Sequence, residues 1–171
     1  PARAQLLAAY GIYRVVGEGM MHEEVIADLQ EAARRIDAAT DADLQVLLYV
    51  ALSTALLQRD LRALLRFTDE TIERLMQDRV FDGVAPDALD PWGMFTQCKV
   101  TALARLGRLR EAADLVQAME ERARERGAIA RLFAHLSASY VHLCAGRAPE
   151  ALGYARQAAA MTEGFENRSV V

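Results

Sequence analysis

Two seven-residue stretches of this chain read alike: Leu-Gly-Arg-Leu-Arg-Glu-Ala at residues 106–112 and Ala-Gly-Arg-Ala-Pro-Glu-Ala at residues 145–151. Their glycines, Gly107 and Gly146, are 39 residues apart, and an apolar run with helical spacing lies on either side of each stretch. A Gly-Arg turn followed by Glu and Ala, repeated at a fixed interval between helices, is typical of stacked helical hairpins. Because one hairpin cannot bury its apolar faces alone, the repeat predicts an array in which each hairpin packs against the next.

The composition favours an all-α fold. The chain has 171 residues, of which 53% are hydrophobic, 26% are charged and only 6% are aromatic. These proportions are those of a folded protein whose helices pack through small side chains. Four prolines and ten glycines leave little material for a fold rich in β-turns. The length accommodates about four hairpins, or about eight helices, in a single domain.

Charge and cysteine content exclude several classes of protein. The net charge is −4, and arginines alternate with glutamates in runs such as residues 120–126, so we expect no nucleic-acid binding. Cys98 and Cys144 have no CxxC partner and predict free thiols in a reducing cytoplasm.

The longest apolar stretch, residues 44–57, is too short to span a membrane. The chain begins at Pro1 rather than Met, which favours a segment of a longer protein.

Hydrophobic periodicity divides the chain into four hairpins. Asp90-Pro91 resembles an N-cap followed by proline in the first helical position, and Gly127 is the expected stop between two helices. The hairpins cover approximately residues 2–38, 42–78, 91–126 and 128–163, with residues 164–167 closing the last helix. The predicted helices are 5–16, 22–38, 42–57, 61–78, 91–106, 109–126, 128–144 and 149–163.

The turns within the hairpins keep a common register. Met20, Arg59, Gly107 and Gly146 occupy equivalent places, separated by 39, 48 and 39 residues. The middle interval is nine residues longer, and the irregular stretch Phe81–Asp90 lies within it. An insertion between two hairpins therefore accounts for the difference.

The pattern of a helix, Gly-x-(apolar)-x-x-Ala and a second helix resembles the tetratricopeptide repeat. Gly107, Leu109 and Ala112 match its turn, Gly146 and Ala151 repeat the match, and Ala158 takes the later small position. The bulky aromatic of the first helix is missing, and the period exceeds the usual one of about 34 residues. The resemblance implies a right-handed α-solenoid of about four such hairpins.

A longer, degenerate repeat of this kind is similar to the helical arrays of large bacterial signalling proteins. The residues that carry this second resemblance are 90–93, 106–108, 151–152 and 162–165. They resemble the C-terminal part of class III adenylate/guanylate cyclases that carry an ATPase module, and of LuxR-type transcriptional regulators. The resemblance implies a sensory or partner-binding arm whose chemistry lies elsewhere in the parent protein.

No catalytic or metal motif stands out. Gly17-Glu18-Gly19 lacks the lysine and third glycine of a phosphate-binding loop and reads as a hairpin turn. His135 and His142 are seven residues apart, about 10.5 Å along a helix, too far for one metal ion to bridge. We therefore predict a segment that is not an enzyme and holds no cofactor or metal.

The remaining candidate site is the concave groove that the first helices line in the resembled repeat. Aromatic and arginine side chains there are typical anchors for a protein or peptide partner, or for another domain of the same parent chain. The alternative for Tyr49 and Tyr140 is packing between helices, and the Phe81–Asp90 loop is a second candidate. A small-molecule effector site and self-association as a homodimer are the other functions to weigh. Carried over by register, the groove residues are Tyr10, Arg14, Tyr49, Ser53, Gln97, Thr101, Arg105 and Tyr140.

Overall fold

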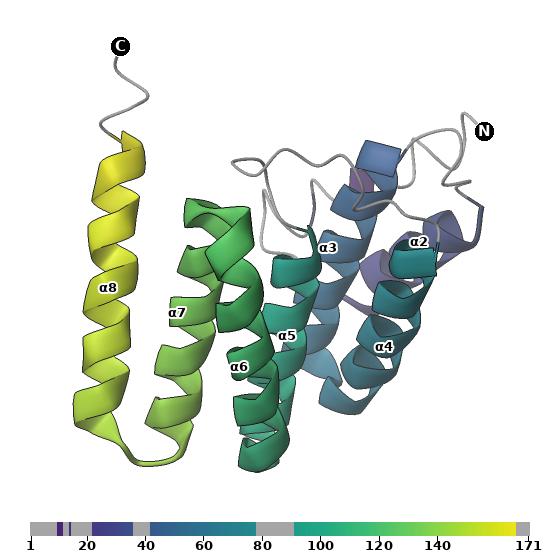
Figure 1. Cartoon of the computed structure of the whole chain (residues 1–171). Helices are drawn as coiled ribbons and strands as arrows, with labels where there is room; N and C mark the ends of the chain where they lie inside the picture. The colour runs from purple at the N-terminus through teal and green to yellow at the C-terminus, as the bar shows by residue number, and fades with distance from the viewer. Residues whose placement is uncertain (1–9, 12–13, 15–21, 36–41, 78–90, 167–171) are drawn as a thin grey trace. The chain divides into compact units, whose positions relative to one another are not determined.

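The computed structural model describes residues 10–11, 14, 22–35, 42–77 and 91–166. The protein is all-helical: these residues form helices α2 to α8, labelled in Figure 1, and no strand. Apart from residues 10, 11 and 14, the helix expected at 5–16 lies outside the described residues, as do the 17–19 turn and the 81–90 loop. Contacts divide the chain into two compact units, Pro1–Val80 (unit 1) and Phe81–Val171 (unit 2).

Apart from residues 10, 11 and 14, the described part of unit 1 is three helices. They are α2 (Glu23–Arg35), α3 (Ala42–Arg59) and α4 (Leu61–Gln77), and α3 packs against both of the others. In α2 the buried residues Val25, Leu29 and Ala32 form one stripe. The helix α3 is instead buried nearly all round, as its apolar sequence predicts, because it has neighbours on two sides.

A single residue, Asp60, separates α3 from α4. Its carboxylate Oδ1 accepts hydrogen bonds from the backbone N–H groups of Arg62 (3.0 Å) and Ala63 (2.9 Å). These are amides of the first turn of α4, which have no partner within the helix, so Asp60 is the N-cap. The bond from Ala63 is the main reason that the pKa of Asp60 lies below its ordinary value.

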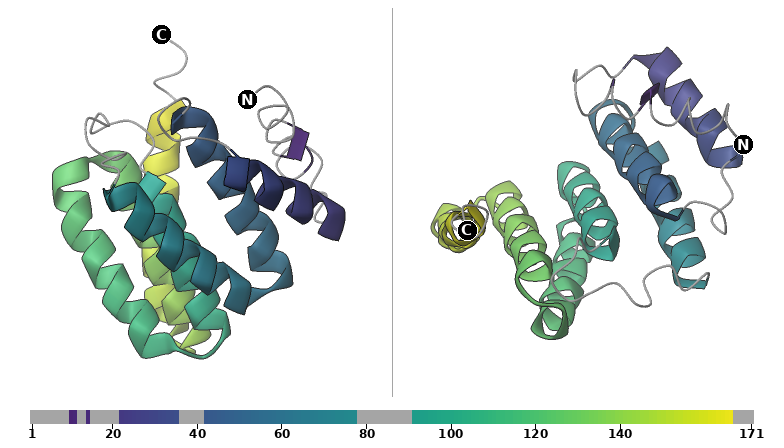
Figure 2. Two further views of the ribbon diagram at one scale, coloured as in Figure 1. Left: turned by 90° about the vertical axis from the view of Figure 1, so that its right-hand side faces the viewer. Right: turned by 90° about the horizontal axis from the view of Figure 1, so that it is seen from above.

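Unit 2 is two consecutive helical hairpins. The first is α5 (Pro91–Arg105) with α6 (Leu109–Arg126), and the second is α7 (Ala128–Cys144) with α8 (Ala148–Glu166). The helix α7 packs against both helices of the preceding hairpin as well as against α8. Seen from above, α7 lies between α8 and the α5–α6 pair (Figure 2). The cation–π contact of Arg122 with Trp92, 4.8 Å from the ring centre, further joins α6 to α5.

The two Gly-Arg turns have the same structure. Gly107 and Gly146 have φ angles of 77° and 73°. The N–H of Arg108 donates to the carbonyl of Leu103 at 2.9 Å, and the N–H of Arg147 donates to the carbonyl of His142 at 2.9 Å. The glycine N–H groups donate to the carbonyls three residues earlier, Gly107 to Ala104 at 3.1 Å and Gly146 to Leu143 at 3.0 Å. Each turn is therefore a Schellman motif, in which a left-handed glycine closes the helix.

Small side chains hold the hairpins of unit 2 together. Ala112 and Ala151, which follow the two turns, are 0% and 6% exposed, and Ala158 is 3% exposed. A larger side chain at these positions would push the paired helices apart. All three alanines are thus buried in unit 2.

Most helix boundaries agree with the sequence prediction. The helices α6 and α7 have the expected ends, with Gly127 alone between them at a φ of 87°. The prediction that residues 164–167 close the last helix is wrong, because α8 continues through Gly164 to Glu166. A single glycine inside a helix, such as Gly164, lowers the stability of the helix by only about 1 kcal/mol, so the helix can continue through it.

Candidate functional site

The eight predicted groove residues fall into both units. In unit 1, Tyr10 is 51% exposed, and the guanidinium of Arg14 lies 5.3 Å from the centre of its ring and donates to its hydroxyl. Tyr49 and Ser53 are buried, at 4% and 0% exposure. Their side chains thus contribute almost no surface for a partner to contact.

Tyr49 packs between helices, which was the other interpretation of this residue. Its hydroxyl accepts a hydrogen bond from Nε2 of Gln45 at 2.9 Å, one turn earlier on α3. Its ring meets the ring of Phe67 on α4 edge to face, with centroids 5.6 Å apart and an interplanar angle of 83°. Such pairs are typical of a well-packed interior.

In unit 2, three of the predicted residues form one row on α5. Gln97, Thr101 and Arg105 follow one another at intervals of four residues, so they lie on the same side of the helix. Gln97 and Thr101 are half-buried and Arg105 is exposed. The Thr101 hydroxyl donates to the backbone carbonyl of Gln97 at 2.9 Å, so this side chain lies along the helix surface.

The fourth predicted residue, Tyr140, lies on α7 in the equivalent row. The 39-residue shift that relates the two turns places Leu136, Tyr140 and Cys144 at the positions of the α5 row. Leu136 is 38% exposed, Cys144 is exposed and Tyr140 is half-buried. The helices α5 and α7 contact each other, and Arg105 of the first row acts on the pKa of Tyr140 in the second. We call them together the α5–α7 face: Gln97, Thr101, Arg105, Leu136, Tyr140 and Cys144.

Electrostatics connect the two rows. Burial raises the pKa of the Tyr140 hydroxyl, and the neighbouring thiol of Cys144 raises it further. The positive charge of Arg105 acts in the opposite direction on the same hydroxyl. Arg105 on α5 therefore lies near enough to Tyr140 on α7 to influence its pKa. Sequence reasoning missed Leu136 and Cys144, although applying the 39-residue shift to Gln97 and Arg105 would have found them.

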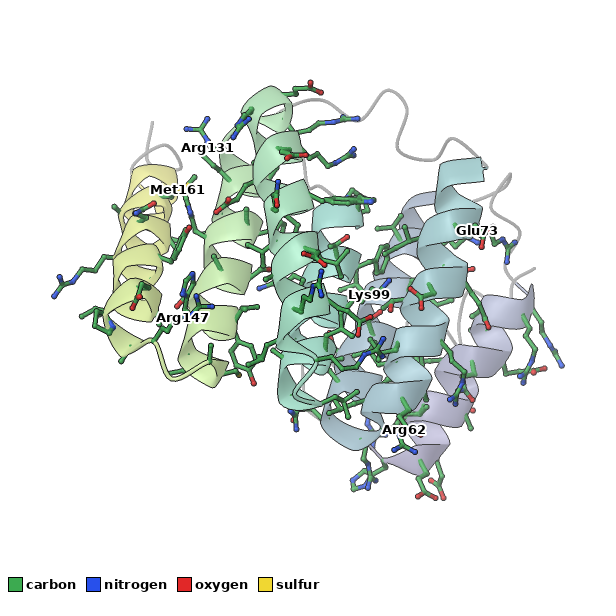
Figure 3. The ribbon with its side chains drawn as sticks, turned by 60° about the horizontal axis from the view of Figure 1, so that its bottom comes forward. Arg62, Glu73, Lys99, Arg131, Arg147 and Met161 are labelled. Atoms are coloured by element: carbon green, nitrogen blue, oxygen red, sulfur yellow. The ribbon has the colours of Figure 1, made fainter. Side chains whose placement is uncertain are left out.

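The two histidines of α7 both contact one tyrosine of α8. The ring centre of Tyr154 lies 5.8 Å from that of His135 and 5.4 Å from that of His142, the latter pair being stacked. Burial lowers the pKa of His135. Along this helix pair Arg131 and Met161 lie at one end and Arg147 at the other (Figure 3). Among the described residues no group of three His, Cys, Asp or Glu is arranged to hold a metal ion.

The thiols differ in environment. Burial raises the pKa of Cys98 to about 11, so its thiol stays protonated at neutral pH. Cys144 is exposed, and neither cysteine is in a disulfide. A thiol kept protonated by an apolar environment is a poor nucleophile, which gives Cys98 a packing role.

Comparison of the chain with protein-family models, with curated proteins and with solved structures gives no match. Within the described residues, no helix has the length and apolar character needed to cross a membrane.

Proposed function

We propose that the chain is a non-catalytic interaction or sensory module of a larger bacterial signalling or transcriptional regulator in the cytoplasm. In this proposal its hairpins stack as a right-handed, TPR-like array of about four units and bind a protein or peptide partner. The observation that carries the proposal is the α5–α7 face, on which two equivalent rows combine exposed apolar, aromatic and cationic side chains.

Repetition within unit 2 supports the array. The two Schellman turns at Gly107 and Gly146 share backbone conformation and hydrogen bonds. The first helix of the second hairpin, α7, contacts both helices of the first hairpin, as stacking requires. The hairpins proposed at 2–38 and 42–78 extend the same scheme into unit 1.

The chemistry of the face defines the kind of partner. Leu136 and Tyr140 offer apolar surface one turn apart on α7, and Arg105, which acts on the pKa of Tyr140, offers donors for a carboxylate. Arg and Tyr are the residue types that most often dominate binding energy at protein interfaces. The partner that fits is a short protein segment with an apolar side chain placed next to an Asp or Glu.

The proposal is tested by selecting peptides from a displayed random library on the intact chain. We expect enriched peptides to contain an apolar residue beside an acidic one. Arg105→Ala and Tyr140→Ala should each weaken their binding about tenfold, the effect of removing one interface anchor. Arg110→Ala, an exposed arginine on α6 that is not a member of the face, is the matched control and should change nothing. Selected peptides that bind all three variants equally, or no enrichment at all, would refute the proposal.

A second candidate function, self-association, is favoured by two exposed leucines near the turn between α7 and α8. Leu143 is 59% exposed and Leu152 is 51% exposed. Large exposed apolar surface often marks a contact between subunits. A mass that rises with concentration in sedimentation equilibrium, and that Leu143→Glu returns to the monomer value, would assign this function. A constant monomer mass would exclude it.

A further inference from the structure

A cluster of polar side chains joins the last three helices of unit 2. It consists of Glu120 on α6, His135 on α7 and Tyr154 on α8, and we call it the polar cluster. Burial raises the pKa of the Tyr154 hydroxyl, and the charge of Glu120 and a hydrogen bond to its carboxylate raise it further, so the hydroxyl is the donor. The ring centre of Tyr154 lies 5.8 Å from that of His135. A change of charge on His135 therefore acts on both of the other groups.

The imidazole of His135 fits its surroundings in the neutral form. Its Nδ1 atom is buried, and none of the described residues provides a hydrogen-bond partner for it. A neutral imidazole carries one N–H and one lone pair, so the lone pair can lie at Nδ1. Protonation places an N–H at Nδ1 as well, and a buried N–H without an acceptor is strongly unfavourable.

The charged groups that act on His135 come from α6 and α7. Burial has the largest effect and lowers its pKa, whereas the carboxylate of Glu120 raises it and the guanidinium of Arg131 lowers it. Arg131, labelled in Figure 3, lies one turn before His135 on α7. Arg124 of α6 lines the same cavity between α6 and α7 as these three residues. The group that faces His135 from α8 is Tyr154.

The other histidine of α7, His142, contacts the same tyrosine. Its Nδ1 atom is also buried without a partner among the described residues, but its ring is stacked on that of Tyr154, with centroids 5.4 Å apart. A cation over the face of a tyrosine ring is attracted to it, which offsets part of the cost of charging His142. Only for His135 is a competition for Glu120 recorded in the described structure, because this carboxylate acts on His135 and already accepts the Tyr154 hydroxyl. The sensing role therefore belongs to His135.

We propose that protonation of His135 releases α8 from α6 and α7 as the pH falls below neutral. Glu120 either leaves the Tyr154 hydroxyl for the imidazolium, or stays with Tyr154 and leaves the new N–H at Nδ1 without an acceptor. Both outcomes favour the released state, in which the imidazolium is hydrated. The helix α8 is the last described helix, and its main neighbour is α7. Local opening costs the least free energy in such end elements.

The direction of the pH effect follows from linkage. Because the pKa of His135 is lowered when α8 is docked, the docked state binds fewer protons than the released state. Docking is therefore strongest at neutral pH, weakens as the pH falls through the ordinary histidine value of about 6.5, and is weakest below the lowered pKa. Release exposes Ala151 and Ala158, which are buried in the docked state. This switch does not rest on the proposed partner face.

Hydrogen exchange of the intact chain, followed by mass spectrometry and corrected for the intrinsic effect of pH on exchange, tests the proposal. The measurements are made at about pH 7.5 and about pH 5.5, on either side of the ordinary histidine pKa. We expect the protection of α8 amides to fall about tenfold in acid relative to that of α3 amides in unit 1. His135→Gln, whose side chain does not titrate, should keep α8 equally protected at both values.

The matched control is His22→Gln, an exposed histidine just before α2, which should keep the full decrease in acid. His142→Gln should keep it as well. Tyr154→Phe retains the ring but lacks the hydroxyl that Glu120 accepts, so α8 should already be less protected at neutral pH. Nuclear magnetic resonance of the His135 ring in the wild type measures its pKa independently of any variant.

Four results would overturn the inference. The first is equal protection of α8 at both pH values in the wild type, and the second is a decrease that persists in His135→Gln. The third is a decrease that His142→Gln abolishes, and the fourth is a His135 ring that titrates at or above the ordinary value of about 6.5.

Discussion

Replacing Gly107 or Gly146 by alanine isolates one physical effect, the cost of a left-handed backbone for a residue with a side chain. Both glycines have φ near 75°, at 77° and 73°. A Cβ atom added at either position would meet no other atom within 4 Å. Alanine also keeps the backbone N–H that each glycine donates in its Schellman motif. Clashes with the rest of the protein and lost hydrogen bonds therefore do not contribute.

The magnitude follows from two opposing terms. A left-handed conformation costs an L-residue roughly 1–2 kcal/mol. Alanine in place of glycine also reduces the entropy of the unfolded chain, which returns about 0.4–1 kcal/mol. The net loss in the free energy of unfolding should be about 1 kcal/mol for each substitution. Because the two turns are separate, the double variant should lose about 2 kcal/mol.

Gly153 is the matched control. It lies inside α8, is exposed, and a Cβ there would also meet nothing within 4 Å. Gly153→Ala makes the same chemical change in a helical backbone, where alanine is favoured by roughly 0.5–1 kcal/mol. The same substitution should thus destabilise the protein at the turns and stabilise it within the helix.

Urea unfolding followed by circular dichroism measures these differences as shifts of the midpoint at constant slope. Gly107→Ala and Gly146→Ala should lower the midpoint, and Gly153→Ala should raise it. A turn variant as stable as the wild type, or a double variant no less stable than either single one, would contradict the reasoning.

Two further predictions concern titratable groups. The pKa of Asp60 is held below its ordinary value by its cap bonds, above all that from Ala63, so its stabilisation is present above about pH 4 and lost as the pH falls through the lowered pKa. Asp60→Asn, which preserves a cap acceptor, should lose less stability between about pH 5 and about pH 2 than the wild type does, because its amide does not titrate in the carboxyl range. Ellman's reagent at about pH 8 should modify Cys144 alone in the folded chain and both cysteines in denaturant, because the pKa of Cys98 is raised to about 11 by burial. The first prediction is refuted if Asp60→Asn and the wild type lose equal stability in acid. The second is refuted if both thiols of the folded chain react rapidly with the reagent.

Local sequence signals predicted the helices well. Proline at position 91 and glycine at 127 gave the ends of α5, α6 and α7 because these residues act on the backbone directly, whatever surrounds them. The Gly-Arg repeat predicted two equivalent turns, and the structure shows the same hydrogen bonds in both. The end of the last helix was predicted too early because Gly164 was taken as a stop signal. A glycine that keeps a helical backbone, as Gly164 does within α8, does not end the helix.

The candidate site was predicted less completely. The register placed Gln97, Thr101 and Arg105 in one row, which the structure shows on α5. It also selected Tyr49 and Ser53, whose side chains are buried because α3 has neighbours on two sides. Periodicity alone does not show how many neighbours a helix has, so it cannot separate a groove residue from a core residue on an apolar helix.

The sequence by itself determined which residues are helical and where the chain turns, because proline, glycine and capping side chains act within one or two helical turns of themselves. Only the tertiary structure decided which faces stay open. The burial of Tyr49, the nearness of Arg105 to Tyr140 and the polar cluster of α6, α7 and α8 all depend on how helices distant in sequence pack together. That packing is set by the fit of many side chains at once, which no short stretch of sequence encodes.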